Sequence, residues 1–62
     1  MLPNDVNILF SYINTKLRDE YPSLEDFCRS NMLDRNSICE KLLSAGYIYD
    51  EELNKFVYKR EG

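Results

Sequence analysis

The sequence DVNILFSYINTKLRDEY, residues 5–21, repeats its apolar residues every three or four positions. This spacing predicts a helix over about residues 5–20 with one face turned toward a core. The apolar face consists of Val6, Leu9, Phe10, Ile13 and Leu17. At about 100° per residue, Ile8 and Tyr12 fall on nearly the opposite side of this helix. Because a helix with two apolar faces needs two covers, we expect the remaining elements or a second copy of the chain to pack on both.

Two shorter helices follow in the sequence. Ser23 is a good N-cap residue for a helix over about residues 24–30. Asp34 is a good N-cap residue for a third helix over about residues 35–45. Gly46 is suited to the left-handed conformation that ends a helix. The chain therefore contains three predicted helices before its last quarter begins.

A change of pattern after this glycine predicts a β-hairpin. The runs YIY and KFVY are rich in aromatic and branched residues, and an acidic turn separates them. They predict a hairpin over about residues 47–58, with Asn54 suited to positive φ in its turn. An isolated hairpin is only marginally stable in water, so we expect it to pack against Ile8 and Tyr12. The predicted fold class is α+β, mainly α: a three-helix mini-domain with a C-terminal β-hairpin, resembling a reduced winged helix-turn-helix.

Length and composition limit the function classes. Sixty-two residues are enough for a single small domain, residues 1–62. The net charge is −3, which gives no electrostatic footprint for nucleic acid or for an anionic membrane surface. The sequence has no signal-peptide pattern and no long apolar run. We therefore expect a cytoplasmic protein in which Cys28 and Cys39 are reduced thiols.

Many residues of the chain match a known family pattern. They are Leu2 and Pro3, residues 8–11, residues 14–21, Ser23, Leu24, Cys28, Lys41, Leu42, Gly46, Tyr47, Tyr49, Asp50, Asn54 and Phe56. On these residues the chain resembles a short bacterial family catalogued as domain of unknown function 4250. The resemblance covers nearly the whole chain, with residues 14–21 as its most specific part. It implies a stand-alone bacterial protein of about this length, and it brings no activity, cofactor or site with it.

The sequence does not predict an enzyme, a metal site or a cofactor. It contains no His, which is the commonest general base and metal ligand. Its adjacent acid pairs lie at the ends of predicted elements or in loops, where acids are simply solvated. Cys28 and Cys39 are eleven positions apart, and a tetrahedral zinc site would need two further ligands. Burial in the core is the better explanation for both cysteines.

One hypothesis assigns the protein to nucleic-acid binding. The second helix of a helix-turn-helix places its exposed face in the major groove. On that reading, the contacting residues are Arg35, Asn36, Lys41, Lys55 and Lys59. Glu40 stands near the middle of the same face and offsets one of these cations, which weakens phosphate binding. We keep this function as the alternative.

The leading hypothesis is a non-enzymatic protein-interaction or regulatory module. The apolar residues in excess of a three-helix core are Ile8, Tyr12, Leu43, Tyr47 and Tyr49. If the hairpin does not cover them, they mark a surface for an unknown protein partner or for a homo-oligomer. Asn14 lies beside the apolar stripe, where Asn is a poor helix former. Asn14 either hydrogen-bonds the backbone of a neighbouring element or belongs to the partner surface, and we favour the structural role.

Overall fold

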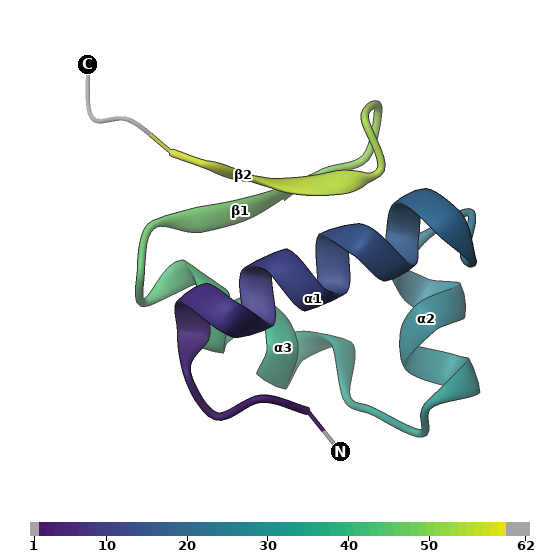
Figure 1. Ribbon diagram of the computed structural model, residues 1–62, viewed down its shortest axis with the longest axis horizontal. Coiled ribbons are helices and arrows are strands. Elements are labelled where there is room, and N and C mark those ends of the chain that lie inside the picture. The colour runs from purple at the N-terminus through teal and green to yellow at the C-terminus, as the bar shows by residue number, and fades with distance from the viewer. Residues whose placement is uncertain (1, 60–62) are drawn as a thin grey trace.

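Three helices and a two-stranded hairpin make up the fold, which a computed structural model describes for residues 2–59. The elements in chain order are α1 (Val6–Asp19), α2 (Leu24–Ser30), α3 (Arg35–Leu43), β1 (Tyr47–Asp50) and β2 (Lys55–Tyr58). The two strands pair antiparallel, with Tyr47 opposite Tyr58 and Asp50 opposite Lys55. The predicted α+β, mainly α class and the predicted order of elements are confirmed (Figure 1).

Side-chain caps fix where the first two helices begin. The carboxylate of Asp5 accepts hydrogen bonds from the backbone N–H groups of Asn7 at 2.8 Å and Ile8 at 3.2 Å. The Ser23 hydroxyl accepts one from the N–H of Asp26 at 3.2 Å. Each bond satisfies a donor that has no partner within the helix. The predicted cap at Ser23 is confirmed.

The third helix is shorter than its sequence pattern predicts. It ends at Leu43. Beyond that residue, the N–H groups of Ala45 and Gly46 donate to the carbonyl oxygens of Leu42 and Leu43. Each of these hydrogen bonds joins residues three positions apart, so the last turn is of the tighter 3₁₀ type. Gly46 follows with a φ of 92°. The left-handed conformation predicted for Gly46 is confirmed, although the helix stops earlier.

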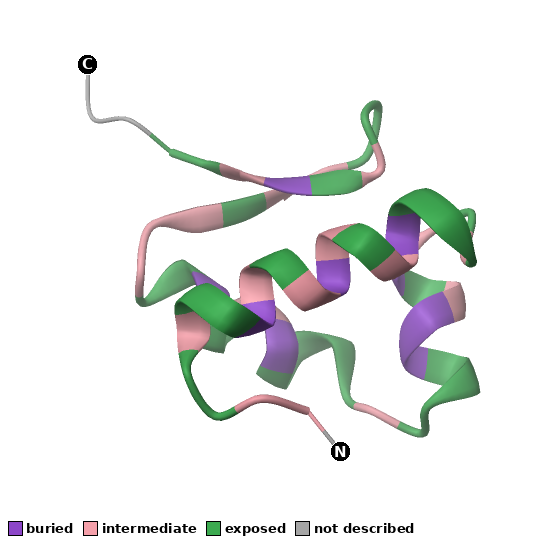
Figure 2. Cartoon of the chain, viewed as in Figure 1, coloured by how far each residue is buried: buried purple, intermediate pink, exposed green. Residues whose placement is uncertain are grey.

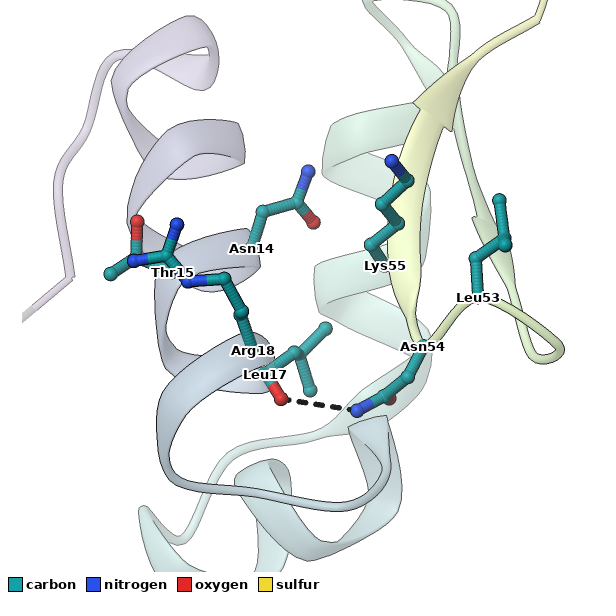
Figure 3. Close-up of a pocket in the computed structure, with 7 residues that line it drawn as sticks. All are labelled: Asn14, Thr15, Leu17, Arg18, Leu53, Asn54 and Lys55. Atoms are coloured by element: carbon teal, nitrogen blue, oxygen red, sulfur yellow. Dashed lines mark hydrogen bonds between the residues drawn. The ribbon is translucent and has the colours of Figure 1, made fainter.

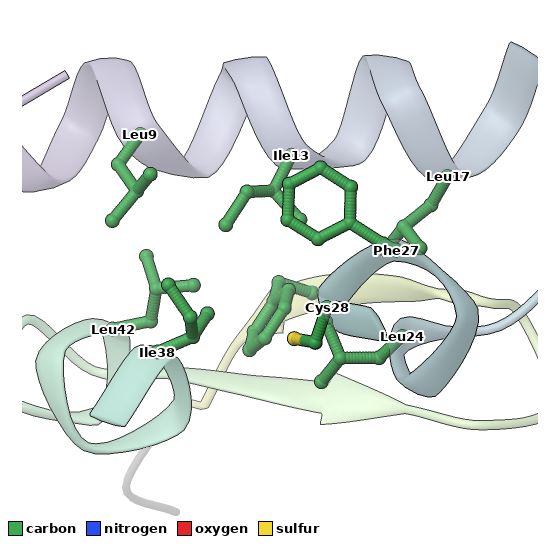
Figure 4. Packing of buried hydrophobic residues seen from close by; sticks show 9 residues of the cluster. Leu9, Ile13, Leu17, Leu24, Phe27, Cys28, Ile38 and Leu42 are labelled. Carbon is green, nitrogen blue, oxygen red and sulfur yellow. The ribbon is translucent and has the colours of Figure 1, made fainter. Parts of the chain in front are cut away.

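The core lies where α1 crosses α2 and α3. Its buried residues are Leu9, Ile13, Leu17, Leu24, Phe27, Cys28, Ile38, Leu42 and Phe56. Figure 4 shows the three α1 residues of this set pointing toward the side chains of α2 and α3. Phe56 comes from β2 and is 1% exposed, so the hairpin is part of the core rather than an appendage. Figure 2 shows exposed, intermediate and buried residues alternating along α1, as expected for a helix with one face in the core.

The hairpin packs on a different side of α1 from the one that the sequence pattern predicts. The Tyr47 ring stacks on Phe10, with 4.0 Å between ring centroids and 16° between planes. Ile8 stays 58% exposed, and Tyr12 is half-buried and lines a depression with Leu2, Asn31 and Leu33 rather than with hairpin residues. The prediction that the hairpin covers Ile8 and Tyr12 is wrong. In Figure 1 the hairpin lies on one side of α1, and the N-terminal segment and the α2–α3 connection lie on the other.

Candidate functional site

Asn14 joins α1 to the hairpin through both ends of its amide. Its Nδ2 donates to the carbonyl oxygen of Phe56 at 3.0 Å, and its Oδ1 accepts from the N–H of Phe56 at 2.7 Å. The side chain thus pairs with the β2 backbone as a neighbouring strand would. The structural role predicted for Asn14 is confirmed.

Asn54 forms a second connection at the far end of the hairpin. Its φ is 53°, as its position in the turn predicts. Its Nδ2 donates to the carbonyl oxygen of Leu17 in the last turn of α1 at 3.1 Å (Figure 3). It also donates to the carbonyl oxygen of Tyr21, just beyond α1, at 3.0 Å. Its Oδ1 accepts from the Tyr49 hydroxyl at 2.6 Å, and that hydroxyl accepts from the N–H of Leu24 at 3.2 Å.

These two asparagines explain why the hairpin cannot reach Ile8. Each satisfies backbone groups that would otherwise be partly buried without a partner, so moving the hairpin would cost several hydrogen bonds at once. Asn14, Tyr49, Asn54 and Phe56 are also among the residues on which the family resemblance rests. This part of the family pattern therefore describes how the hairpin is held, which is a structural role.

On the opposite side of α1, Ile8 is exposed, and the apolar residues of the depression are only partly buried. We call Leu2, Ile8, Tyr12, Met32 and Leu33 the Ile8 surface. Leu2, Tyr12 and Leu33 line a shallow depression of about 100 Å³, together with Asn31. Ile8 lies one helical turn before Tyr12 and therefore on the same side of α1.

Met32 makes this surface more exposed than the sequence pattern suggests. It lies between two residues of the depression, is 93% exposed, and has a φ of 55°. A positive φ is uncommon for a residue with a long side chain. Sequence analysis identified Ile8 and Tyr12 but not Leu2, Met32 or Leu33, because a short turn and a terminal segment carry no periodic signal.

A charged pair borders the Ile8 surface. The Nζ of Lys16 lies 5.7 Å from the centroid of the Tyr12 ring and 2.7 Å from a carboxylate oxygen of Glu20. The hydrogen bond and the charge of Glu20 raise the pKa of Lys16 above its ordinary value. Lys16 therefore stays positive at the edge of an otherwise apolar surface.

The remaining residues predicted for a partner surface do not gather there. Leu43 is 55% exposed at the end of α3. Tyr47 and Tyr49 face the helices instead of the solvent, and both hydroxyls donate within the fold, to Asn7 at 2.8 Å and to Asn54. Tyr47 and Tyr49 are thus half-buried parts of the hairpin attachment. Their side chains are therefore engaged within the fold and do not extend the Ile8 surface.

The cations of the nucleic-acid hypothesis lie in separate places. Lys55 borders an open depression of about 570 Å³ between α1 and the hairpin, together with Arg18 (Figure 3). Arg35 borders a different depression of about 160 Å³, whose lining includes Glu25 and Glu51. The structure does not bring Arg35 and Lys55 into one depression.

The other residues of the nucleic-acid hypothesis are exposed, but they do not share one element. Asn36 and Lys41 lie on α3, and Lys59 directly follows β2. Arg18 is no free cation, because it makes hydrogen bonds of 2.9 and 3.2 Å to the Asp19 carboxylate. That pair lowers the pKa of Asp19.

Within residues 2–59, no three His, Cys, Asp or Glu side chains lie close enough to hold a metal ion. Cys28 is buried, and this burial raises the pKa of its thiol, with a smaller contribution from Cys39. A thiol in this state is a poor nucleophile because the thiolate is the reactive form. Over the same residues, the helices are all too short or too polar to cross a membrane.

Comparison with known proteins places the chain in a family without assigning it an activity. No curated protein and no solved structure matches the chain. A sequence model of one family matches residues 3–56, which span all three helices, β1 and the start of β2. The chain therefore belongs to the family described as Domain of unknown function (DUF4250).

Proposed function

We propose that this protein is a non-enzymatic protein-binding module that receives an apolar segment of a partner protein on the Ile8 surface. The observation that supports this is the 58% exposure of Ile8, on a helix whose other large apolar side chains are buried or partly buried. Met32, at 93% exposure, extends the same apolar character into the α2–α3 turn. Contiguous exposed apolar side chains bordered by polar residues are typical of protein-interaction sites.

Burial of this surface by a partner would be energetically favourable. Full burial of an Ile or Met side chain is worth about 1.5–3 kcal/mol. Ile8 lies on a capped helix, so little side-chain order has to be created when a partner binds. Lys16, which borders the surface, would favour a partner with a carboxylate beside its apolar residues.

Site-specific photocrosslinking in cells tests the proposal. A photoreactive amino acid replaces Ile8 in one variant and Glu52 in a matched control. Glu52 is exposed in the turn between β1 and β2, at the other end of the molecule (Figure 1). We expect a discrete adduct with another protein from position 8 and none from position 52.

A second variant separates specific binding from chance contact. In a chain with the photoreactive residue at Tyr12, Ile8→Glu should abolish the adduct, while Glu52→Lys should leave it unchanged. Equal adducts from positions 8 and 52, or an adduct that persists with Ile8→Glu, would contradict the proposal.

Nucleic-acid binding is the alternative function. It is favoured by the exposure of Arg35, Asn36 and Lys41 on or at the start of α3, the second helix of the helix-turn-helix-like pair. It is opposed by Glu25 and Glu51 beside Arg35, because these carboxylates offset the charge that phosphate contacts need. Fluorescence anisotropy with random-sequence duplex DNA distinguishes the two. Binding at low salt that disappears at moderate salt would favour the alternative, and no binding at low salt would remove it.

A further inference from the structure

The two edges of the hairpin differ in whether their outward backbone groups are hydrogen-bonded. On β2, the outward N–H and C=O of Phe56 are both bonded to Asn14. On β1, the outward groups follow from the register. Lys59 donates to the carbonyl oxygen of Gly46, so the pairs that bond across the hairpin are those of Gly46, Ile48 and Asp50.

The backbone groups of Tyr47 and Tyr49 therefore point away from β2. Within residues 2–59, no hydrogen bond to these N–H or C=O groups is formed. An edge with unpaired donors and acceptors is a template for another strand. β1 is thus an open edge, whereas on the β2 edge Asn14 occupies the outward groups of Phe56.

We propose that β1 pairs with β1 of a second copy of this chain, antiparallel about a two-fold axis at Ile48. In this register Tyr47 of each copy pairs with Tyr49 of the other, so all the outward groups of both residues are bonded. A shift of the axis by one residue would leave some of these groups unpaired or place Ile48 opposite Asp50. The surface is distinct from the Ile8 surface, so either proposal can fail alone.

The side chains support the same register. Opposite residues of a sheet point to the same face, so Ile48 shares the outer face with Val57 of its own hairpin. Ile48 is 38% exposed there. Across the two-fold axis it meets its own copy, which makes a continuous apolar row of Val57, Ile48, Ile48 and Val57.

Charge does not oppose a second copy as the occupant. Asp50 is the charged residue of β1, and in this register it lies opposite Gly46 of the second copy. No like charges therefore face each other between the two β1 strands as the structure describes them. A strand of four residues is a small interface, so we expect a weak, reversible dimer.

Sedimentation equilibrium with charge variants tests this dimer. For the wild-type chain, the apparent mass should rise toward that of a dimer between about 10 µM and about 1 mM. Ile48→Lys alone and Ile48→Glu alone should stay monomeric, because each places like charges opposite each other at the axis. An equal mixture of the two variants should regain the dimer, which a folding defect could not produce.

The control uses an exposed apolar residue outside the strands. Leu53→Lys and Leu53→Glu, alone and mixed, should dimerise as the wild type does, since Leu53 is 59% exposed in the hairpin turn. A wild-type mass that stays monomeric to about 1 mM, or a mixture of Ile48 variants that remains monomeric, would overturn the proposal. Loss of the dimer by Ile8→Glu with retention by Ile48→Lys would also overturn it and place the contact on the Ile8 surface.

Discussion

Replacing Asn14 with Ala should remove the attachment of β2 to α1. The substitution deletes both hydrogen bonds to Phe56 and leaves its N–H and C=O without a protein partner. A buried group left unpaired costs about 1–3 kcal/mol, and we use the lower end for each because the site is only partly buried. The higher helix propensity of Ala returns up to about 0.7 kcal/mol. The expected loss in the free energy of unfolding is therefore about 1.5 kcal/mol.

That loss is large for a chain of this length. A domain of 62 residues has a total stability of about 3–9 kcal/mol. Urea denaturation followed by far-UV circular dichroism measures the change. With a slope of about 1 kcal/mol per molar urea, the midpoint should fall by about 1.5 M.

Two further variants make the reasoning refutable. Thr15→Ala changes the exposed neighbour on the same helix and should shift stability by less than about 0.5 kcal/mol. Asn14→Asp keeps an acceptor for the N–H of Phe56 but directs a carboxylate oxygen at its carbonyl, so it should be at least as harmful as Asn14→Ala. A loss below about 0.5 kcal/mol for Asn14→Ala, or wild-type stability for Asn14→Asp, would refute the argument.

Four other predictions concern the turns and the thiols. Asn54→Gly keeps the left-handed backbone but loses the three hydrogen bonds of the Asn54 side chain. Measured by urea denaturation, it should therefore be nearly as destabilising as Asn54→Ala. Wild-type stability of Asn54→Gly would contradict this. Gly46→Ala should cost about 1–2 kcal/mol because φ is 92°, and adding Tyr58→Ala should recover only the contact of the new Cβ, 2.8 Å from the Tyr58 ring. With a thiol reagent near neutral pH, Cys39 should react readily and Cys28 only after unfolding; equal rates would contradict the burial of Cys28. Because its pKa is raised above the ordinary value of 9.0, the contribution of Cys28 to stability should be complete below about pH 9 and fall as the pH rises further.

The elements could be predicted from the sequence because each has a local signal. The apolar spacing of α1, the cap at Ser23 and the glycine at position 46 are all read within a few residues. Asn14 could be recognised as unusual because an amide beside an apolar stripe needs a partner. The correct predictions were those that depend on residues close together in the sequence.

The placement of the hairpin could not be predicted in the same way. Phe10 was assigned to the core face. It does pack at the edge of the core, and it also stacks on Tyr47, which the sequence pattern did not predict. Which face of α1 receives the hairpin depends on hydrogen bonds between residues about forty positions apart. Apolar periodicity contains no information on such partners. It therefore could not distinguish Ile8 and Tyr12 from Phe10 as the residues against which the hairpin packs.

The central claim is that the hairpin packs on the Phe10 side of α1 and leaves Ile8 free. Nuclear Overhauser contacts in the isotopically labelled protein test this most directly. We predict strong contacts between the rings of Phe10 and Tyr47, and none between the methyl groups of Ile8 and any hairpin proton. Contacts from Ile8 to the hairpin rings would contradict the account, because the proposed partner surface would then be covered by the protein itself.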